Sequence, residues 1–228
     1  MHRNDKSDFR FLMTILNRRG DDTKDDPSFR AVRSHLRRGA DSSTEHYAIP
    51  HVFPHVPESA SNSQQRTLLR VAAIAAEYSR VPSVKYHSGY IRKSFGRWCN
   101  ELSRALASRA NPTTPDSDSP ANFQSNSEPI RLDQSKPDVI AQRLAYLHTE
   151  NFEEAVLSVR RILQIAQGLN PTPSLDYIDL YKMLSHWGNG ISEASQQVRL
   201  GPLRDYYSAS GRSDEFPTGP PTIKNSNN

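Results

Sequence analysis

Apolar residues recur along most of this chain at intervals of three and four, the period of an amphipathic α-helix. The pattern is clearest over residues 152–166, and Asn151 and Glu154 supply a capping-box sequence at its start. A nearly continuous apolar run from about residue 64 to 79 predicts a central helix that is buried all round. Similar stripes predict helices at about 8–17, 27–38, 94–110, 140–147, 174–187 (capped by Ser174) and 192–207, the last interrupted at Gly201-Pro202. Because no segment alternates with period two, the fold is expected to be all-α.

Residues 111–137 interrupt the helical pattern. They contain five prolines and many serine, aspartate and asparagine residues, with little that could be buried. We therefore expect two small helical bundles joined by a Pro/Ser-rich insertion. The predicted units are an N-terminal helical domain (1–110), a flexible linker (111–137), a C-terminal helical bundle (138–210) and a disordered tail (211–228).

Composition limits the possible classes of protein. The 228 residues are 35% hydrophobic and 24% charged, with a formal net charge of +4, so a basic binding surface must be local. The lone cysteine, Cys99, cannot form an intramolecular disulfide. No signal-like apolar run and no stretch long enough to span a bilayer is visible, which predicts a cytoplasmic protein with no membrane partner.

The chain offers little for catalysis or metal binding. The close histidines His46, His51 and His55 lie in a proline-rich segment, where an ordered loop with short turns is expected instead of the helix that an i, i+4 metal pair needs. Cys99 falls on an apolar-striped helix, as a buried thiol does, and neither a nucleophile elbow nor a glycine-rich phosphate loop is present. We expect no enzyme, no cofactor and no metal.

Arginines outside the apolar stripes are the strongest functional signal. Arg30, Arg33 and Arg37 fall within about 60° on one helix face, where like charges destabilise the helix unless an anion compensates them. Neither Arg160 nor Arg161 has an acidic residue at i+4. Such surfaces suit the phosphates of a polyanion, although arginines of this kind also occur on solvated or salt-bridged surfaces. The predicted nucleic-acid-binding residues are Arg33, Arg37, Arg38, Arg97, Arg104, Arg143, Arg160 and Arg161.

Taken in order, these segments resemble the CasB small-subunit family of the type I-E CRISPR surveillance complex, Cascade. The resemblance covers most of residues 8–110 and 138–207, and the order and spacing of the segments carry it, because each one alone is a generic amphipathic helix. The insertion and the tail have no counterpart. The matching pieces include Phe29-Arg30-Ala31-Val32-Arg33, the Pro50/Pro54/Pro57 segment, Gln64-Gln65-Arg66-Thr67-Leu68-Leu69-Arg70, Ser94-Phe95-Gly96-Arg97, Gln142-Arg143-Leu144, Val159-Arg160-Arg161-Ile162-Leu163 and Asp176-Tyr177 through Trp187-Gly188.

The resemblance implies a two-part helical protein without catalytic activity that helps to hold opened DNA. Its implied partners are guide RNA, the target and displaced DNA strands, the backbone and large subunits of Cascade, and a second copy of itself. The implied role is to stabilise the R-loop between guide RNA and target DNA in antiviral defence. Two alternatives remain open from the sequence: a sequence-specific helical DNA-binding regulator, and a scaffold whose arginines meet only acidic protein partners.

Overall fold

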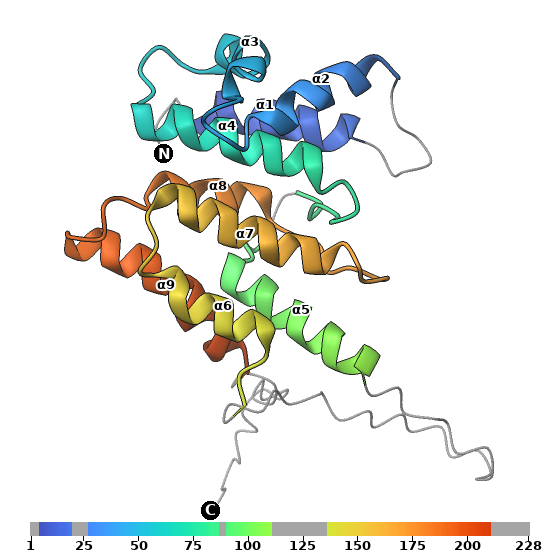
Figure 1. The fold of residues 1–228 in the computed structure, drawn as a ribbon, viewed down its shortest axis with the longest axis vertical. Helices are drawn as coiled ribbons and strands as arrows, with labels where there is room; N and C mark the ends of the chain where they lie inside the picture. The colour runs from blue at the N-terminus through green and yellow to red at the C-terminus, as the bar shows by residue number, and fades with distance from the viewer. Residues whose placement is uncertain (1–4, 20–26, 87–89, 111–135, 211–228) are drawn as a thin grey trace, which may run out of the picture.

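The computed structural model describes residues 5–19, 27–86, 90–110 and 136–210. Over these residues the chain forms α-helices and short 3-10 turns, with one isolated parallel bridge between Ser83 and Leu175. The prediction of an all-α fold is confirmed (Figure 1). The expected flexibility of 111–135 and disorder of the tail concern residues outside the described part of the chain.

The N-terminal group is built on a central helix, α4 (Asn62–Glu77), against which α1 (Asp5–Arg18) and α2 (Pro27–Arg38) pack. Ten consecutive residues of α4, from 67 to 76, are buried, as the apolar run predicts. Ser61 and Gln64 form a capping box that satisfies backbone N–H groups at its start. The central position of this helix confirms the reading of the apolar pattern.

Residues 45–55 lie in the segment predicted to be an ordered loop with short turns. They form a 3-10 turn η1 (Glu45–Tyr47), a single turn α3 (Ile49–Val52) and a second 3-10 turn η2 (Phe53–His55). Pro50 and Pro54 lie in the first turn of α3 and η2, where a missing backbone N–H leaves no helical bond unmade. The prolines exclude a long helix here, but they are compatible with these short ones.

The C-terminal group contains α5 (Phe95–Ala110), α6 (Val139–Leu147), α7 (Phe152–Ala166), α8 (Tyr177–Ser185) and α9 (Glu193–Ser210). Helix α5 packs along α9 and also contacts α6, so the last helix of the predicted N-terminal domain lies with the C-terminal group. Helix α8 contacts α4 and α1, and the buried apolar cluster includes residues of both groups. The domain limits of 1–110 and 138–210 stay a prediction.

Two local predictions in this half are wrong. Helix α9 continues through Pro202, although this residue cannot donate the helical N–H bond. Close packing against α5 supports the helix at this point, because Gly96 brings the α5 backbone against Pro202. Helix α8 is capped by Asp176, whose side chain accepts the N–H groups of Ile178 and Asp179, and not by Ser174.

Asp179 joins α8 to α5 by accepting the backbone N–H of Phe95 at 3.2 Å. Burial, reinforced by the charge of Asp176, raises the pKa of Asp179 to about 6 from 3.8. Between these two pH values the folded protein holds a proton that the unfolded chain has lost, so this group's contribution to stability falls as the pH rises toward 6. The loss is complete above that pH.

Asp179→Asn keeps an acceptor for Phe95 and removes the ionisation. We expect the variant to be about 1–2 kcal/mol more stable than the wild type at pH 7.5, less than the full shift implies, because the site is partly hydrated. The difference should shrink toward pH 4. Urea unfolding at several pH values measures it, and a difference that does not change with pH would contradict the assignment.

Candidate nucleic-acid interface

A buried arginine holds together the helices that carry the α2 and α7 arginines. Arg70, in the middle of α4, is 1% exposed, and its Nη1 donates to the carbonyl oxygen of Gly39, at the end of α2, at 2.8 Å. The same guanidinium binds Glu45 at 2.7 Å and Glu153, at the start of α7, at 2.8 and 2.9 Å. Burial alone lowers the pKa of Arg70, but the bonds to Glu153 and Glu45 outweigh it and leave the pKa above its ordinary value. Arg70 therefore ties α2 and α7 to α4.

Arg160, one of the predicted contact residues, is also linked to α4. Its Nε and Nη2 each donate to the carboxylate of Glu77 at 3.1 Å, and the closest nitrogen–oxygen distance is 2.9 Å. The sequence prediction considered only carboxylates nearby in the sequence, whereas Glu77 is 83 residues away in the chain. The structure thus gives Arg160 an intramolecular partner, and its contact with nucleic acid stays a prediction.

The arginines of α2 differ in how they are held. Arg37 and Arg38 are exposed, and the Arg38 guanidinium lies 4.2 Å from the ring centroid of Tyr47. This cation–π contact orients Arg38 while its charge stays at the surface. Arg33 is half-buried and makes an interaction of its own within the protein.

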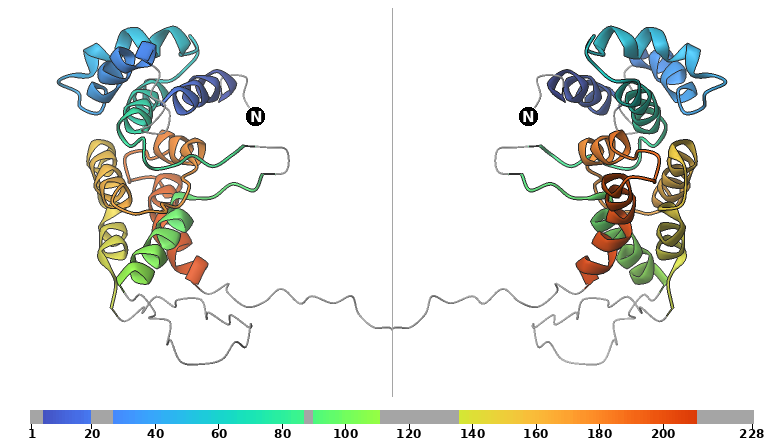
Figure 2. Two further views of the ribbon diagram at one scale, coloured as in Figure 1. Left: turned by 90° about the vertical axis from the view of Figure 1, so that its right-hand side faces the viewer. Right: turned by 90° about the vertical axis from the view of Figure 1, so that its left-hand side faces the viewer.

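The structure brings helices α2 and α7, which carry five of the predicted arginines, onto one side of the molecule (Figure 2). Figure 2 shows α2 and α7 on the same side, with α1 on the other. Burial, followed by the charge of Glu77, raises the pKa of Tyr78, while the charges of both Arg160 and Arg37 oppose this shift. Both arginines therefore lie near the Tyr78 hydroxyl. We call this set the α2–α7 group; it consists of Arg33, Arg37, Arg38, Arg160 and Arg161.

The three other predicted contact residues lie on α5 and α6. Arg97 and Arg104 are half-buried on α5, and Arg104 donates to the carbonyl oxygen of Ala209 at 3.1 Å, where α5 meets α9. Arg143, on α6, is half-buried, and its Nε has no hydrogen-bond partner among the described residues. The structure thus gives Arg104 a partner on α9, and nucleic-acid contact by Arg97, Arg104 and Arg143 stays a prediction.

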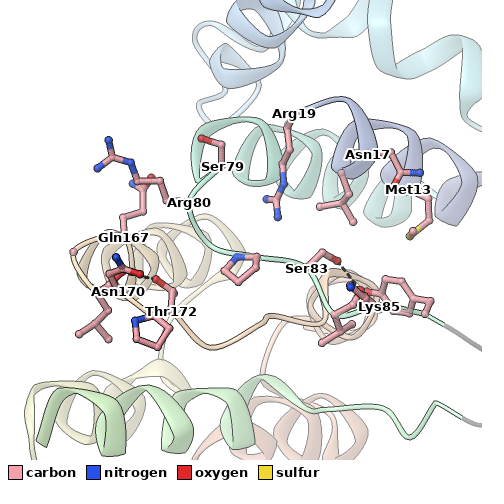
Figure 3. A pocket seen from close by; sticks show the side chains of 17 residues that line it. Met13, Asn17, Arg19, Ser79, Arg80, Ser83, Lys85, Gln167, Asn170 and Thr172 are labelled. Carbon is pink, nitrogen blue, oxygen red and sulfur yellow. Dashed lines mark hydrogen bonds between the residues drawn. The ribbon is translucent and has the colours of Figure 1, made fainter. Parts of the chain in front are cut away.

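A polar cleft that the sequence prediction missed lies between α1, the end of α4 and the turn after α7 (Figure 3). Its volume is about 1270 Å³, and its described lining contains Arg19, Arg80 and Lys85 but no carboxylate. Arg19 is buried and donates to the carbonyl oxygens of Ala75, Tyr78 and Val81 at 2.6–3.4 Å. It therefore caps the C-terminal end of α4, and its guanidinium has a structural role.

The histidines form a pair across two elements. Nδ1 of His35, on α2, lies 2.9 Å from Nε2 of His51, on α3, whereas His55 stacks on Phe11. Burial, followed by the charge of His35, lowers the pKa of His51. In the described part of the chain, no group of three or more His, Cys, Asp or Glu side chains is placed to hold a metal ion.

No helix among the described residues is long and apolar enough to cross a bilayer.

A comparison with protein-family models identifies the chain. The model of the CRISPR-associated protein Cse2 matches residues 32–207. The chain belongs to the Cse2 family. This match spans most of the sequence and confirms the resemblance to the CasB small subunits. A search of curated protein sequences finds no match.

Solved structures share the fold of this Cse2 family member. A CRISPR-associated protein of the Cse2 family from Thermus thermophilus is similar with a TM-score of 0.53 and 16% identity, over 88% of this chain and 97% of that one. A chain of a CRISPR RNA-guided surveillance complex gives a TM-score of 0.55 and 18% identity, over 91% and 95%. CasB from M. ruber gives 0.50 and 14%, over 92% and 96%. At these identities the likeness shows the common fold.

Proposed function

We propose that this Cse2 family member is the non-catalytic small subunit of a type I-E Cascade complex, in which it binds nucleic-acid backbone and stabilises the R-loop. Family membership is the observation that carries the proposal. The likeness in fold to a chain of an RNA-guided surveillance complex supports it. We place the protein in the cytoplasm, with guide RNA, the target and displaced strands, the backbone and large subunits, and a second copy of itself as its partners.

The α2–α7 group is the proposed contact surface. Guanidinium groups on rigid helices neutralise phosphates at any sequence, so such a surface positions a strand without reading its bases. In guide-RNA systems base pairing reads the target, which leaves the protein to hold backbones and the displaced strand. Exposed Arg37, Arg38 and Arg161 are the leading contacts, because their charges lie at the surface. Arg33, Arg97, Arg104, Arg143 and Arg160 complete the proposed set.

We assign no catalytic step to the chain. The only cysteine, Cys99, is buried, and burial raises the pKa of its thiol well above 9.0. A thiol held in its neutral form is a poor nucleophile. Strand cleavage would then belong to another component of the system.

Reversal of two charges on α2 tests the proposal. Arg37→Glu/Arg38→Glu should weaken binding of the purified protein to single-stranded DNA by about tenfold or more at low salt. If both residues contact phosphates, the slope of log affinity against log salt should become less steep by about 1.4. In the assembled complex the same variant should shorten the lifetime of the R-loop without changing which guide–target mismatches are tolerated. Filter binding and R-loop dissociation kinetics measure these effects.

Arg10→Glu/Arg204→Glu is the matched control, because it makes the same charge change at exposed positions on α1 and α9. If the control weakens binding as much as the α2 variant, only net charge matters and the α2–α7 group is not a site. Selection from random DNA duplexes should yield no enriched motif; an enriched motif would favour the regulator. Copurification with guide RNA and other Cascade subunits is expected, and its failure would contradict the assignment to the complex.

A further inference from the structure

Two arginines, Arg70 and Arg160, link α4 to α7, and they differ in how much of the side chain is exposed to solvent. Arg70 is 1% exposed and is held by two carboxylates and a carbonyl oxygen, whereas Arg160 and its partner Glu77 are 26% and 21% exposed. Water reaches the Arg160–Glu77 pair in part, so solvent screens this pair more than it screens the bonds of Arg70. The Arg160–Glu77 pair can therefore open without loss of the core, while the Arg70 bonds cannot.

The edge of Arg160 that Glu77 occupies can also bind phosphate. Nε and Nη2 form a planar fork, which binds a carboxylate or a phosphate through two parallel hydrogen bonds. Glu77 takes both of these donors at 3.1 Å. A phosphate can use the same fork only when the carboxylate has left it.

The charges around this pair come from both sides of α4. The electrostatic effect of Arg160 reaches the Tyr78 hydroxyl, where Arg37 of α2 also acts, and the carboxyl of Asp41. Glu77 thus places a negative charge among the cations of the α2–α7 group. An incoming phosphate meets repulsion from Glu77 together with the attraction of Arg37 and Arg160.

We infer that Glu77 is an internal competitor for phosphate at Arg160, and that it sets the affinity of the α2–α7 group for nucleic-acid backbone. In the free protein the carboxylate occupies the Arg160 fork. When a strand binds, a phosphate replaces the carboxylate and Glu77 turns to solvent. The inference rests on the proposed function, because it concerns the strength of the same contact surface.

Glu77→Gln is the direct test, since it keeps the shape of the side chain and removes its charge. The variant should bind a single-stranded oligonucleotide about two- to fivefold more tightly at low salt, the size expected for one partly exposed charge pair. The salt dependence of log affinity should become steeper by about 0.7, because the charge of Arg160 that neutralises a phosphate is no longer offset by Glu77. Glu58→Gln is the matched control: it removes a charge from an exposed residue outside the α2–α7 group and should leave both quantities unchanged.

A double-mutant cycle with Arg160→Gln separates competition from a positioning role. If Glu77 competes, Arg160→Gln lowers the affinity of the wild type for the oligonucleotide only slightly. In the Glu77→Gln background, the same substitution removes the whole gain in affinity. If Glu77→Gln instead weakens binding, the carboxylate positions Arg160, and the inference is overturned. Equal affinities of Glu77→Gln and Glu58→Gln also overturn it. If the wild type binds no oligonucleotide and Arg37→Glu/Arg38→Glu changes nothing, the proposed function itself fails.

Discussion

Arg70→Met is expected to lower the free energy of unfolding by about 2–4 kcal/mol. Removing one partner of a buried ion pair typically costs about 3–5 kcal/mol, because the remaining charge is left without compensation. Here Glu45 and Glu153 are 31% and 40% exposed, so water can hydrate them in part and the cost falls at the lower end. The carbonyl oxygen of Gly39 also loses its donor. Urea unfolding followed by circular dichroism measures the effect.

Arg66→Met, on the same helix, is the matched control. Arg66 is exposed, and the structure places its guanidinium over the Phe152 ring at 5.2 Å. A cation–π contact at an exposed site is worth about 0.5–1 kcal/mol. In the triple variant Arg70→Met/Glu45→Gln/Glu153→Gln, stability should partly return, because the uncompensated charges are gone. Equal unfolding midpoints for Arg70→Met and Arg66→Met would show that Arg70 does not tie the helices together.

Local patterns predicted the helices because local forces form them. The period of apolar residues over 152–166 and the Asn151–Glu154 capping box both reappear in the structure, where Asn151 accepts the N–H of Glu154. Pro202 shows the limit of this reasoning. A proline ends an isolated helix, but in α9 the contact with α5 holds the helix together on both sides of it.

Long-range pairs explain why the candidate site was harder to predict than the fold. The partner of Arg160 comes from another helix, and no spacing rule connects residues that far apart in sequence. One signal was present, however. Arg70 lies in a run that is otherwise apolar all round, and a charge at a buried position needs a partner with the opposite charge. That conflict predicts a buried ion pair on α4, although it cannot say which carboxylates supply it.

Gly96→Ala is the second change expected to have a large effect, because it adds a methyl group where two helices touch. An ideal Cβ at Gly96 would lie 2.1 Å from the carbonyl oxygen of Pro202 and 2.8 Å from Cβ of Asp205. The first of these atoms belongs to the backbone of α9, so no side-chain rotation can relieve the overlap. Overpacking of this kind costs about 1–3 kcal/mol and occasionally more. We expect a loss of about 3 kcal/mol, which thermal and urea unfolding measure.

Gly201→Ala makes the same chemical change where the structure leaves room. No atom lies within 4 Å of a Cβ built at Gly201, outside its own helix backbone and chain neighbours. The gain in helix propensity of about 1 kcal/mol is offset by the crowding of a Cβ against the ring of the following proline. This variant should therefore stay within about 1 kcal/mol of the wild type. Gly96 is where the backbones of α5 and α9 approach closely. Similar stabilities for the two alanine variants would mean that the helices can separate there without lowering the free energy of unfolding. The continuity of α9 through Pro202 would then have another cause.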